Sequence, residues 1–311
     1  MPVRPRHGSR ELVCFMATTA LLAAAACAPA PSGVNRPAGS PGRPAAAVDT
    51  VRPLTDHEED VLYEAEQLLT QSCMRARGFR IWVVPRTPLP EDRDFPYVVD
   101  DTRWAREHGY GSDMQRRRDQ VRASDPNRRY FQSLSPADRM RGMDALHGKR
   151  DGGRLEVTVP NGMNFTRYTE GCTARAQEQL YGDLEGWFRS STITNVLDDM
   201  GRGKVFAEQE FKDAVKDWAA CMRKRGFRHA TPEETRRAFS EPSDAAARTK
   251  EIRTAVAEAD CARSSGLSDT ALRLEKRQRD RLAEQYAPEY ETRKRLERVA
   301  LPRARAIVER G

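Results

Sequence analysis

The sequence predicts a mainly α-helical, disulfide-stapled domain with a small β-hairpin and a long C-terminal helical segment. Three observations predict this fold class: capped stretches with apolar residues at helical spacing, an even number of cysteines left after an export signal, and strand-like alternation around an Asn-Gly pair. Of 311 residues, 38% are hydrophobic and 32% are charged, so the chain has less apolar material than an average globular protein. One segment alone is apolar enough for a bilayer, which excludes a polytopic membrane protein.

Residues 1–27 have the pattern of a lipoprotein-type signal peptide. Three arginines precede fifteen uncharged residues (12–26), and small residues lead up to Cys27. This pattern predicts that Cys27 is lipidated and becomes the first residue of the mature protein, although Ala24 stands where lipoprotein signals prefer Leu. The alternative is ordinary signal-peptidase cleavage after the same alanines, which would release a secreted protein.

Residues 28–54 are predicted to form a flexible tether. They are rich in Pro, Ala and Gly and show no apolar periodicity. Such a spacer holds a lipid-anchored domain clear of the membrane surface. The signal carries three arginines and one glutamate, so its removal lowers the formal net charge by two, from +7 to +5.

Two copies of one helix ending indicate an internal repeat. CMRARGFR at 73–80 and CMRKRGFR at 221–228 agree at seven of eight positions, and each closes an amphipathic stretch. In each copy the glycine is predicted to adopt a left-handed conformation, so that the following phenylalanine packs back on the methionine. A second cysteine follows each copy, Cys172 in the first and Cys261 in the second. The predicted units are 55–183 with a large insertion, 184–267, and a long charged helical segment at 268–311.

Caps, turns and periodicity predict the remaining elements. Thr55 and Glu58 form a capping box, and Thr231-Pro232 begins another helix. Asn161-Gly162 is predicted to be the type I′ turn of the hairpin. Helices are also predicted at 101–109, 136–147 and 244–264, a short strand at 81–84, and kinks or breaks of the last segment at Pro288 and Pro302.

A narrow apolar seam is predicted along the last segment, as on a helix that docks against a domain or pairs in a coiled coil. Its members are Leu272, Leu282, Tyr286, Tyr290, Leu296 and Val299.

Four cysteines remain after Cys14 leaves with the signal and Cys27 is lipidated, an even number that favours disulfides in an exported chain. The repeat selects one of three pairings, Cys73 with Cys172 and Cys221 with Cys261. A metal site would need closely spaced ligand pairs such as Cys-x-x-Cys, and none occurs. A nucleophilic cysteine is disfavoured because the C-terminal end of a helix raises the pKa of a thiol.

No sequence motif for catalysis, metal binding or cofactor binding occurs in the chain. We therefore assign no catalytic residue, metal or cofactor from the sequence. The four histidines of the mature chain are predicted to lie on solvated faces, and the four tryptophans are predicted to anchor the core rather than line a ligand groove. They are His57, His108, His147 and His229, and Trp82, Trp104, Trp187 and Trp218.

The insertion carries most of the clustered positive charge. Residues 101–150 hold 12 Lys and Arg against 7 Asp and Glu. The candidates for contact with an anionic surface are Arg116, Arg117, Arg118, Arg128 and Arg129. Outside the cell such a surface is phospholipid headgroups or wall polymer, not nucleic acid. The alternative is a solvated cluster whose field is partly neutralised by the interleaved aspartates.

The combined pattern resembles a family of secreted lipoproteins of actinomycetes such as streptomycetes. The features that carry the resemblance are the signal ending at Cys27, the paired CM-x-x-x-GF helix endings, the GC…LYGD stretch at 171–183, and ADC…GL followed by a long Arg- and Glu-rich helix. The resemblance implies a lipid-anchored extracytoplasmic protein and implies no particular activity.

We expect a binding or interaction protein of the cell envelope. Its expected partners are the membrane, through the lipid anchor, an anionic lipid or wall polymer, and an envelope protein. The alternative is a secreted enzyme whose active site matches no motif. Converging carboxylates or a His–carboxylate pair in a cleft would favour the enzyme, and a basic or aromatic face would favour the binding protein.

Overall fold

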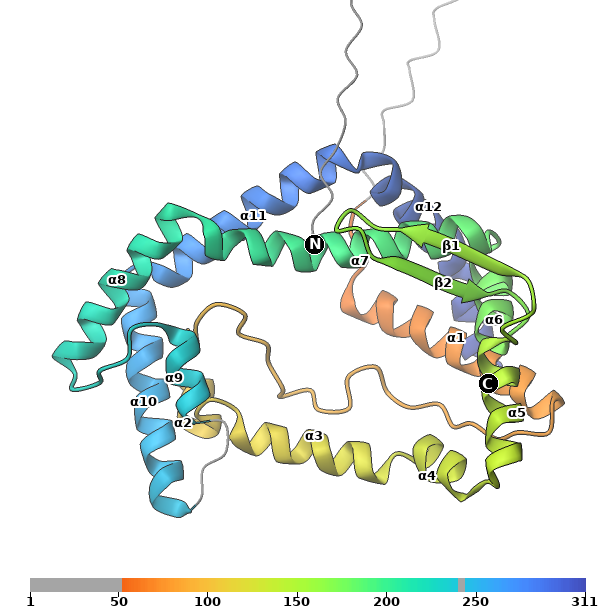
Figure 1. Cartoon of the computed structure of the whole chain (residues 1–311), viewed down its shortest axis with the longest axis horizontal. Helices are drawn as coiled ribbons and strands as arrows, with labels where there is room; N and C mark the ends of the chain where they lie inside the picture. The colour runs from red at the N-terminus through yellow and green to blue at the C-terminus, as the bar shows by residue number, and fades with distance from the viewer. Residues whose placement is uncertain (1–51, 240–243) are drawn as a thin grey trace, which may run out of the picture. The chain divides into compact units, whose positions relative to one another are not determined.

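The computed structural model describes residues 52–239 and 244–311, whose helices and strands are shown in Figure 1. The chain divides into two units, residues 1–50 and 51–311, and all described residues belong to the second. The predicted signal peptide, Cys27 and most of the predicted tether lie outside the described residues. The described part is mainly helical, with one small hairpin and two disulfides, so the predicted fold class is confirmed.

The described residues form twelve helices and two strands. They are α1 (Asp56–Ala76), α2 (Thr102–His108), α3 (Ser112–Ser124), α4 (Pro126–Ser133), α5 (Pro136–His147), β1 (Arg154–Thr158), β2 (Asn164–Tyr168), α6 (Cys172–Tyr181), α7 (Leu184–Ala207), α8 (Gln209–Lys224), α9 (Pro232–Ala238), α10 (Ala245–Ser264), α11 (Leu267–Gln285) and α12 (Ala287–Val308).

α1 begins and ends as predicted. The Thr55 hydroxyl accepts the backbone N–H of Glu58, and the Glu58 carboxylate accepts the N–H of Thr55 at 2.9 Å, which completes the capping box. At the other end Gly78 has a φ of 82°, and the N–H of Phe79 donates to the carbonyl of Met74 at 2.9 Å. This is the hydrogen bond of a Schellman ending, in which only glycine takes the left-handed position without strain.

α8 ends in the same way. Gly226 has a φ of 89°, and the N–H of Phe227 donates to the carbonyl of Met222 at 3.0 Å. Met74 and Met222 are both fully buried, each packed with the phenylalanine of its own ending. The two copies of the sequence motif therefore form the same local structure.

Two disulfides join helices that are distant in sequence. Cys73 of α1 bonds to Cys172 at the start of α6, and Cys221 of α8 bonds to Cys261 of α10, with Cα–Cα distances of 5.5 and 5.7 Å. These are the two pairs that the repeat predicts. Disulfides are typical of oxidising compartments outside the cytoplasm. None of the helices in the described residues has the length and apolar character to cross a membrane.

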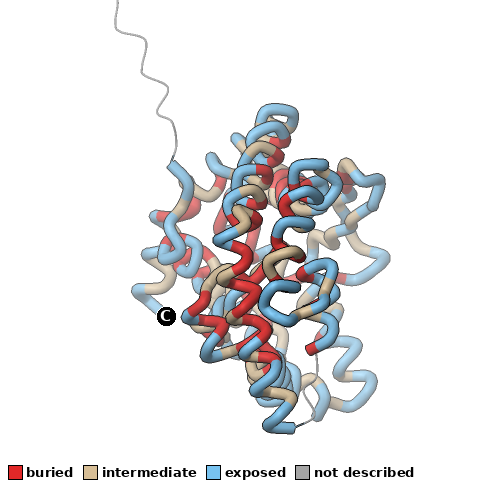
Figure 2. The backbone as a smooth tube through the Cα atoms, turned by 90° about the vertical axis from the view of Figure 1, so that its left-hand side faces the viewer, coloured by how far each residue is buried: buried red, intermediate tan, exposed pale blue. Residues whose placement is uncertain are grey.

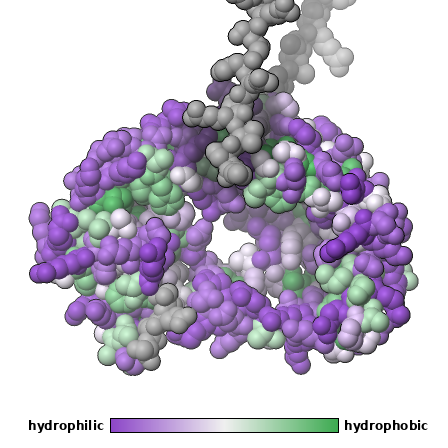
Figure 3. Space-filling model, viewed as in Figure 1, coloured by the Kyte–Doolittle hydropathy of each residue, from purple (hydrophilic) through white to green (hydrophobic). Residues whose placement is uncertain are grey.

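The core consists of several apolar clusters between neighbouring helices. α1, α6 and α12 pack around Ala65, Leu180 and Ala300, whereas α8, α10 and α11 pack around Trp218 and Leu274. Figure 2 shows buried residues along the sides on which neighbouring helices face one another. In Figure 3 the hydrophobic residues visible on one face lie in small areas among hydrophilic ones. Small clusters suit a chain with so little apolar material.

The hairpin pairs β1 with β2 in antiparallel register, with Thr158 opposite Asn164. The prediction of a type I′ turn at Asn161-Gly162 is wrong. The N–H of Gly162 donates to the carbonyl of Val159 at 2.8 Å, so the central residues of the turn are Pro160 and Asn161. Proline cannot take the positive φ that the first central position of a type I′ turn requires.

The predicted strand at 81–84 does not form, although all four residues are described. Side chains satisfy the backbone there instead. The Asn127 amide bonds to both the N–H and the carbonyl of Trp82, at 2.7 and 2.9 Å, and Gln71 donates to the carbonyl of Ile81. The chain consequently runs from the end of α1 to α2 as a long irregular segment.

α3 and α4 are helices that the sequence does not predict. α3 buries Ser112 and Met114, and none of the described residues of α4 is buried. Because these helices bury so little, their sequences lack the apolar periodicity that would have indicated them.

The predicted helical segment from 268 onwards forms α11 and α12, which meet at Tyr286, two residues before Pro288. α12 continues through Pro302 without a break in its helical structure. The predicted seam is wrong at two positions, since Leu272 is 58% exposed and Val299 is 51% exposed. The other four members are buried or half-buried.

Candidate functional site

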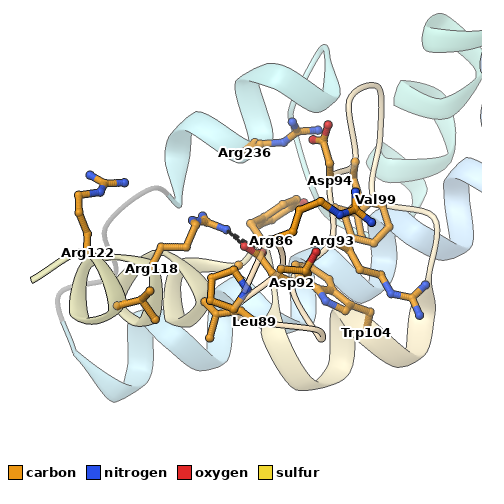
Figure 4. A pocket seen from close by; sticks show the side chains of 16 residues that line it. Arg86, Leu89, Asp92, Arg93, Asp94, Val99, Trp104, Arg118, Arg122 and Arg236 are labelled. Atoms are coloured by element: carbon orange, nitrogen blue, oxygen red, sulfur yellow. Dashed lines mark hydrogen bonds and ion pairs between the residues drawn. The ribbon is translucent and has the colours of Figure 1, made fainter. Parts of the chain in front are cut away.

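The candidate functional site is a pocket along the irregular segment between α1 and α2. The pocket is lined by residues of 86–99, by Trp104 of α2, by residues from Tyr110 to Arg122 on and before α3, and by Arg236 of α9. Its volume is about 740 Å³, within the usual range for small-molecule sites. Figure 4 shows Arg118 and Arg122 extending from α3, with Arg236 entering from α9.

Aromatic side chains form part of the pocket wall. The Phe95 and Trp104 rings lie 4.8 Å apart between centroids, and the Trp104 Nε1–H donates to the carbonyl of Glu91 at 3.0 Å, which fixes the indole. Gly111 precedes α3 with a φ of 84°, and a Cβ there would lie 3.2 Å from the Trp104 ring. The position therefore favours glycine for both its backbone conformation and its close approach to the wall.

The charge of the lining is predominantly positive, with five arginines and two aspartates. Four of the arginines contact carboxylates. Arg118 donates to both oxygens of Asp92 at 2.7 Å, and Arg122 lies 3.6 Å from Asp119. Arg86 pairs with acidic residues of α1, and Arg93 pairs with the residue that caps α2. Arg236 has no carboxylate partner among the described residues. Its guanidinium is therefore the cation most available to a ligand.

A buried carboxylate supports the pocket from behind. The Tyr110 hydroxyl donates to Glu258 of α10 at 2.7 Å, and the N–H of Val99 donates to its other oxygen at 3.1 Å. Burial raises the pKa of Glu258 to about 7, and the nearby Arg236 opposes part of this rise. Burial and the neighbouring Glu258 also raise the pKa of the Tyr110 hydroxyl. Glu258 is fully buried, so its role is to position Tyr110 and Val99 in the wall.

Glu251, about two turns before Glu258 on the same face of α10, fixes the turn that leads into α3. Its carboxylate accepts the N–H of Tyr110 at 2.8 Å and the hydroxyl of Ser112 at 2.7 Å, and it pairs with Arg248 at 2.8 Å. A Cβ at Gly109 would lie 2.7 Å from this carboxylate. α10 therefore determines where Tyr110 and Gly111 stand in the pocket.

The prediction that the histidines are solvated is wrong for His108. Its side chain is 13% exposed, and its Nδ1 lies 2.7 Å from Asp113. The neighbouring Ser112 hydroxyl donates to Glu251 and not to the His108 ring. Ser112, His108 and Asp113 therefore do not form a Ser–His–acid relay. His57 and His147 are exposed as predicted, and His229 is half-buried.

A metal centre is not formed by the described residues, in which no three His, Cys, Asp or Glu side chains come together as ligands. The groups that the pocket presents are guanidinium, carboxylate and aromatic side chains. Guanidinium groups are suited to binding anions such as carboxylates and phosphates.

The five arginines singled out from the sequence are not one cluster. Arg117 pairs with Glu91 and Arg118 with Asp92, so their charge is directed towards the irregular segment. Arg116, Arg128 and Arg129 are exposed and have no carboxylate partner in the described part of the chain. Arg118 alone of the five lines the pocket.

Trp218 and Trp187 anchor the core as predicted, whereas Trp104 is buried and also lines the pocket, a role that the sequence analysis set aside. Trp218 is fully buried, Trp104 is 7% exposed, and Trp187 stacks on Tyr181 with ring centroids 3.6 Å apart. Trp82 is 37% exposed, and the Arg80 guanidinium lies 5.7 Å from its ring centroid. The prediction is therefore wrong for Trp82.

Sequence reasoning missed the residues that define the pocket, above all Arg236, Tyr110 and Glu258. One signal was present: Glu251 and Glu258 lie seven residues apart, on the same helical face as Ala255 and Ala262. A glutamate on a stripe of small apolar residues indicates a buried carboxylate that must be hydrogen-bonded.

The comparisons with known proteins find no similarity: no protein-family model matches the chain, and no match is found among curated proteins or solved structures.

Proposed function

We propose that this protein is a lipid-anchored, extracytoplasmic binding protein of the cell envelope that holds a small anionic, partly apolar ligand in the arginine pocket. The observation that carries the proposal is the lining itself, in which five arginines and two aspartates surround a cavity walled by Phe95 and Trp104. We further propose that the chain belongs to the actinomycete lipoprotein family that its sequence resembles.

The charges of the pocket support an anionic ligand. Arg236 is half-buried and unpaired with any described carboxylate, and desolvation of a guanidinium strengthens its attraction for an anion. Arg122 lies 3.6 Å from its aspartate, a loose contact that a ligand can replace. The aromatic wall supports an apolar portion in the same ligand.

The location is supported by the two disulfides and by the signal sequence that ends at Cys27. We propose diacylglycerol attachment at Cys27, with simple secretion as the alternative. Radiolabelled palmitate fed to producing cells should enter the protein and should be absent from Cys27→Ser. Label that persists in the variant would contradict the anchor.

The membrane or wall would supply a second contact. Arg128 and Arg129 of α4 are exposed and unpaired with described carboxylates, so we include anionic lipid or wall polymer among the proposed partners.

Calorimetric titration tests the pocket. The probes are 2-naphthalenesulfonate, an aromatic anion, and 2-naphthalenemethanol, which has the same ring system without the charge. We expect the sulfonate to bind more tightly, and we expect Arg122→Gln to weaken the sulfonate roughly tenfold, the equivalent of about 1.4 kcal/mol, while leaving the alcohol unchanged.

Arg116→Gln is the matched control, because Arg116 is an exposed arginine of the same helix that does not line the pocket. Equal affinity for both probes, or equal weakening by Arg116→Gln and Arg122→Gln, would contradict the proposal.

A further inference from the structure

A second cavity, of about 720 Å³, borders the irregular segment at Pro96 and Tyr97 and is mainly apolar. It is lined by Pro96 and Tyr97 of that segment, by Phe206 of α7, by Phe211 and Val215 of α8, and by residues leading into α9. Apart from Arg236, none of its lining residues belongs to the arginine pocket. It is therefore a distinct cavity that meets the arginine pocket at Arg236.

Three aromatic rings form the wall of this cavity. The ring centroids of Tyr97, Phe206 and Phe211 lie between 5.3 and 5.9 Å from one another. Phe206 is 45% exposed although it touches two buried rings, so the apolar surface continues into the open cavity. Contact with an apolar ligand would remove this surface from water.

The geometry of the rings favours a flexible chain over a flat ligand. Their interplanar angles are 49°, 62° and 82°, so no two of them are parallel. A planar ligand stacks well between parallel ring faces, whereas an alkyl chain can follow a wall of tilted rings.

Cations line the same cavity. On α8, Phe211 and Val215 form an apolar stripe one helical turn long. Lys212 and Lys216, the next residue in each case, form a cationic stripe beside it. Lys216 pairs with Asp213 at 2.7 Å, whereas Lys212 and Arg236 have no carboxylate partner in the described residues. The acidic lining residue Glu233 is paired with Arg237.

We propose that this cavity binds a single-chain amphiphilic anion, with the alkyl chain against Tyr97, Phe206 and Phe211 and the anionic head at Lys212 and Arg236. The complementarity is of two kinds in one cavity, apolar for the chain and positive for the head. A fatty-acid anion is the simplest molecule of this class. The proposal rests on the aromatic wall and Lys212, which the arginine pocket lacks, and shares only Arg236 with that pocket.

The test is displacement of cis-parinaric acid, a fluorescent fatty acid, from the mature chain carrying Cys27→Ser, produced by export so that both disulfides form. Palmitate should displace the probe. 1-Hexadecanol, which has the chain without the charge, should be at least tenfold weaker, and butyrate, which has the charge without the chain, should not compete.

Variants locate the site. Phe206→Asp should weaken palmitate binding at least tenfold. Val299→Asp, which changes an apolar residue of α12 with similar exposure, should leave palmitate binding unchanged. Lys212→Gln should weaken palmitate and leave hexadecanol unchanged. Because Phe206 and Lys212 are both exposed, these variants should keep the helical circular dichroism of the wild type. If Phe206→Asp does not fold, Lys212→Gln still tests the site.

Four results would overturn the proposal: no palmitate binding below its aggregation concentration, equal potency of palmitate and hexadecanol, equal effects of Phe206→Asp and Val299→Asp, or loss of palmitate binding in Arg122→Gln. The last result would place the fatty acid in the arginine pocket instead. A failure of the naphthalenesulfonate experiment with normal palmitate displacement would contradict the proposed function and leave this inference intact.

Discussion

Glu258 shows how a single buried side chain connects several parts of this molecule. Through its two oxygens it holds the hydroxyl of Tyr110 and the N–H of Val99, at 2.7 and 3.1 Å, and both residues line the arginine pocket. Each of these bonds spans roughly 150 residues of sequence, with separations of 148 and 159. Burial raises the pKa of this carboxyl to about 7, so its protonation state changes near neutral pH.

The first prediction concerns the pH dependence of stability. Burial raises the pKa of Glu258 from 4.5 to about 7, so between these values the folded state retains a proton that the unfolded state releases. The free energy of unfolding should then fall as pH rises from about 5 to 7, by on the order of 2 kcal/mol from this group. Glu258→Gln mimics the protonated carboxyl and should remove that part of the dependence.

Thermal unfolding followed by circular dichroism at pH 5 and pH 7 measures the effect. The variant and the wild type should have similar melting temperatures at pH 5, and the variant should be the more stable at pH 7. Glu66 and Asp100, whose pKa values are also raised, should contribute equally to the pH dependence of stability in both proteins. Parallel pH profiles of the two proteins would contradict the assignment.

At the scale of elements, the repeated helix endings are the best-defined local structures of the chain. Gly78 and Gly226 both lie in the left-handed region, and a Cβ at either position would meet nothing within 4 Å. Substitution therefore introduces backbone strain without a steric clash.

The second prediction is that Gly78→Ala and Gly226→Ala each lower the free energy of unfolding by about 1 kcal/mol. Gly203→Ala is the matched control. Gly203 lies inside α7 with helical backbone and an equally open Cβ position, so alanine there should be neutral or stabilising, by about 0.5–1 kcal/mol. Urea unfolding measures all three, and a loss of stability in Gly203→Ala equal to the others would show that any added methyl group is disruptive.

The pairing of elements also explains why the predicted basic cluster divides. α3 turns Arg117 and Arg118 towards Glu91 and Asp92 of the irregular segment, which lies more than twenty residues earlier in the chain. A count of charges within residues 101–150 does not include these partners, because Glu91 and Asp92 lie outside that stretch of sequence. Arg128 and Arg129 have none among the described residues and retain the exposed positive charge that the sequence suggests.

At the scale of the whole molecule, the disulfides compensate for scattered apolar clusters. Cys73–Cys172 and Cys221–Cys261 close sequence separations of 99 and 40 residues. Closing such loops lowers the conformational entropy of the unfolded chain. The chain-entropy model assigns the two disulfides a stabilisation of about 4.7 and 4 kcal/mol respectively.

The third prediction is that replacing either cysteine pair by alanine lowers the free energy of unfolding by about 4 kcal/mol. Urea unfolding of the wild type, of Cys73→Ala with Cys172→Ala, and of Cys221→Ala with Cys261→Ala measures this. The wild type in reducing agent should behave like a protein that lacks both bonds. A paired variant with an unchanged midpoint would show that the disulfide contributes little to stability.

Local interactions made much of the fold predictable. The capping box at Thr55, the endings at Gly78 and Gly226, the helix begun at Thr231 and the hairpin all depend on residues within a few positions of one another. α3, α4 and the 24-residue α7 escaped prediction, because α3 and α4 bury few side chains and α7 lacks a strong apolar stripe.

The sequence by itself determined the helical class, the two cysteine pairs and the helix endings at Gly78 and Gly226, because helix caps and repeated motifs are decided by neighbouring residues. It did not determine the exposure of Trp82, the partial burial of His108 or the partners of Arg117 and Arg118. The tertiary structure alone decided both cavities, because their walls combine residues from the irregular segment, α2, α3, α7, α8 and α9. A site of this kind depends on which distant segments pack together, and that packing cannot be predicted from any short stretch of the sequence.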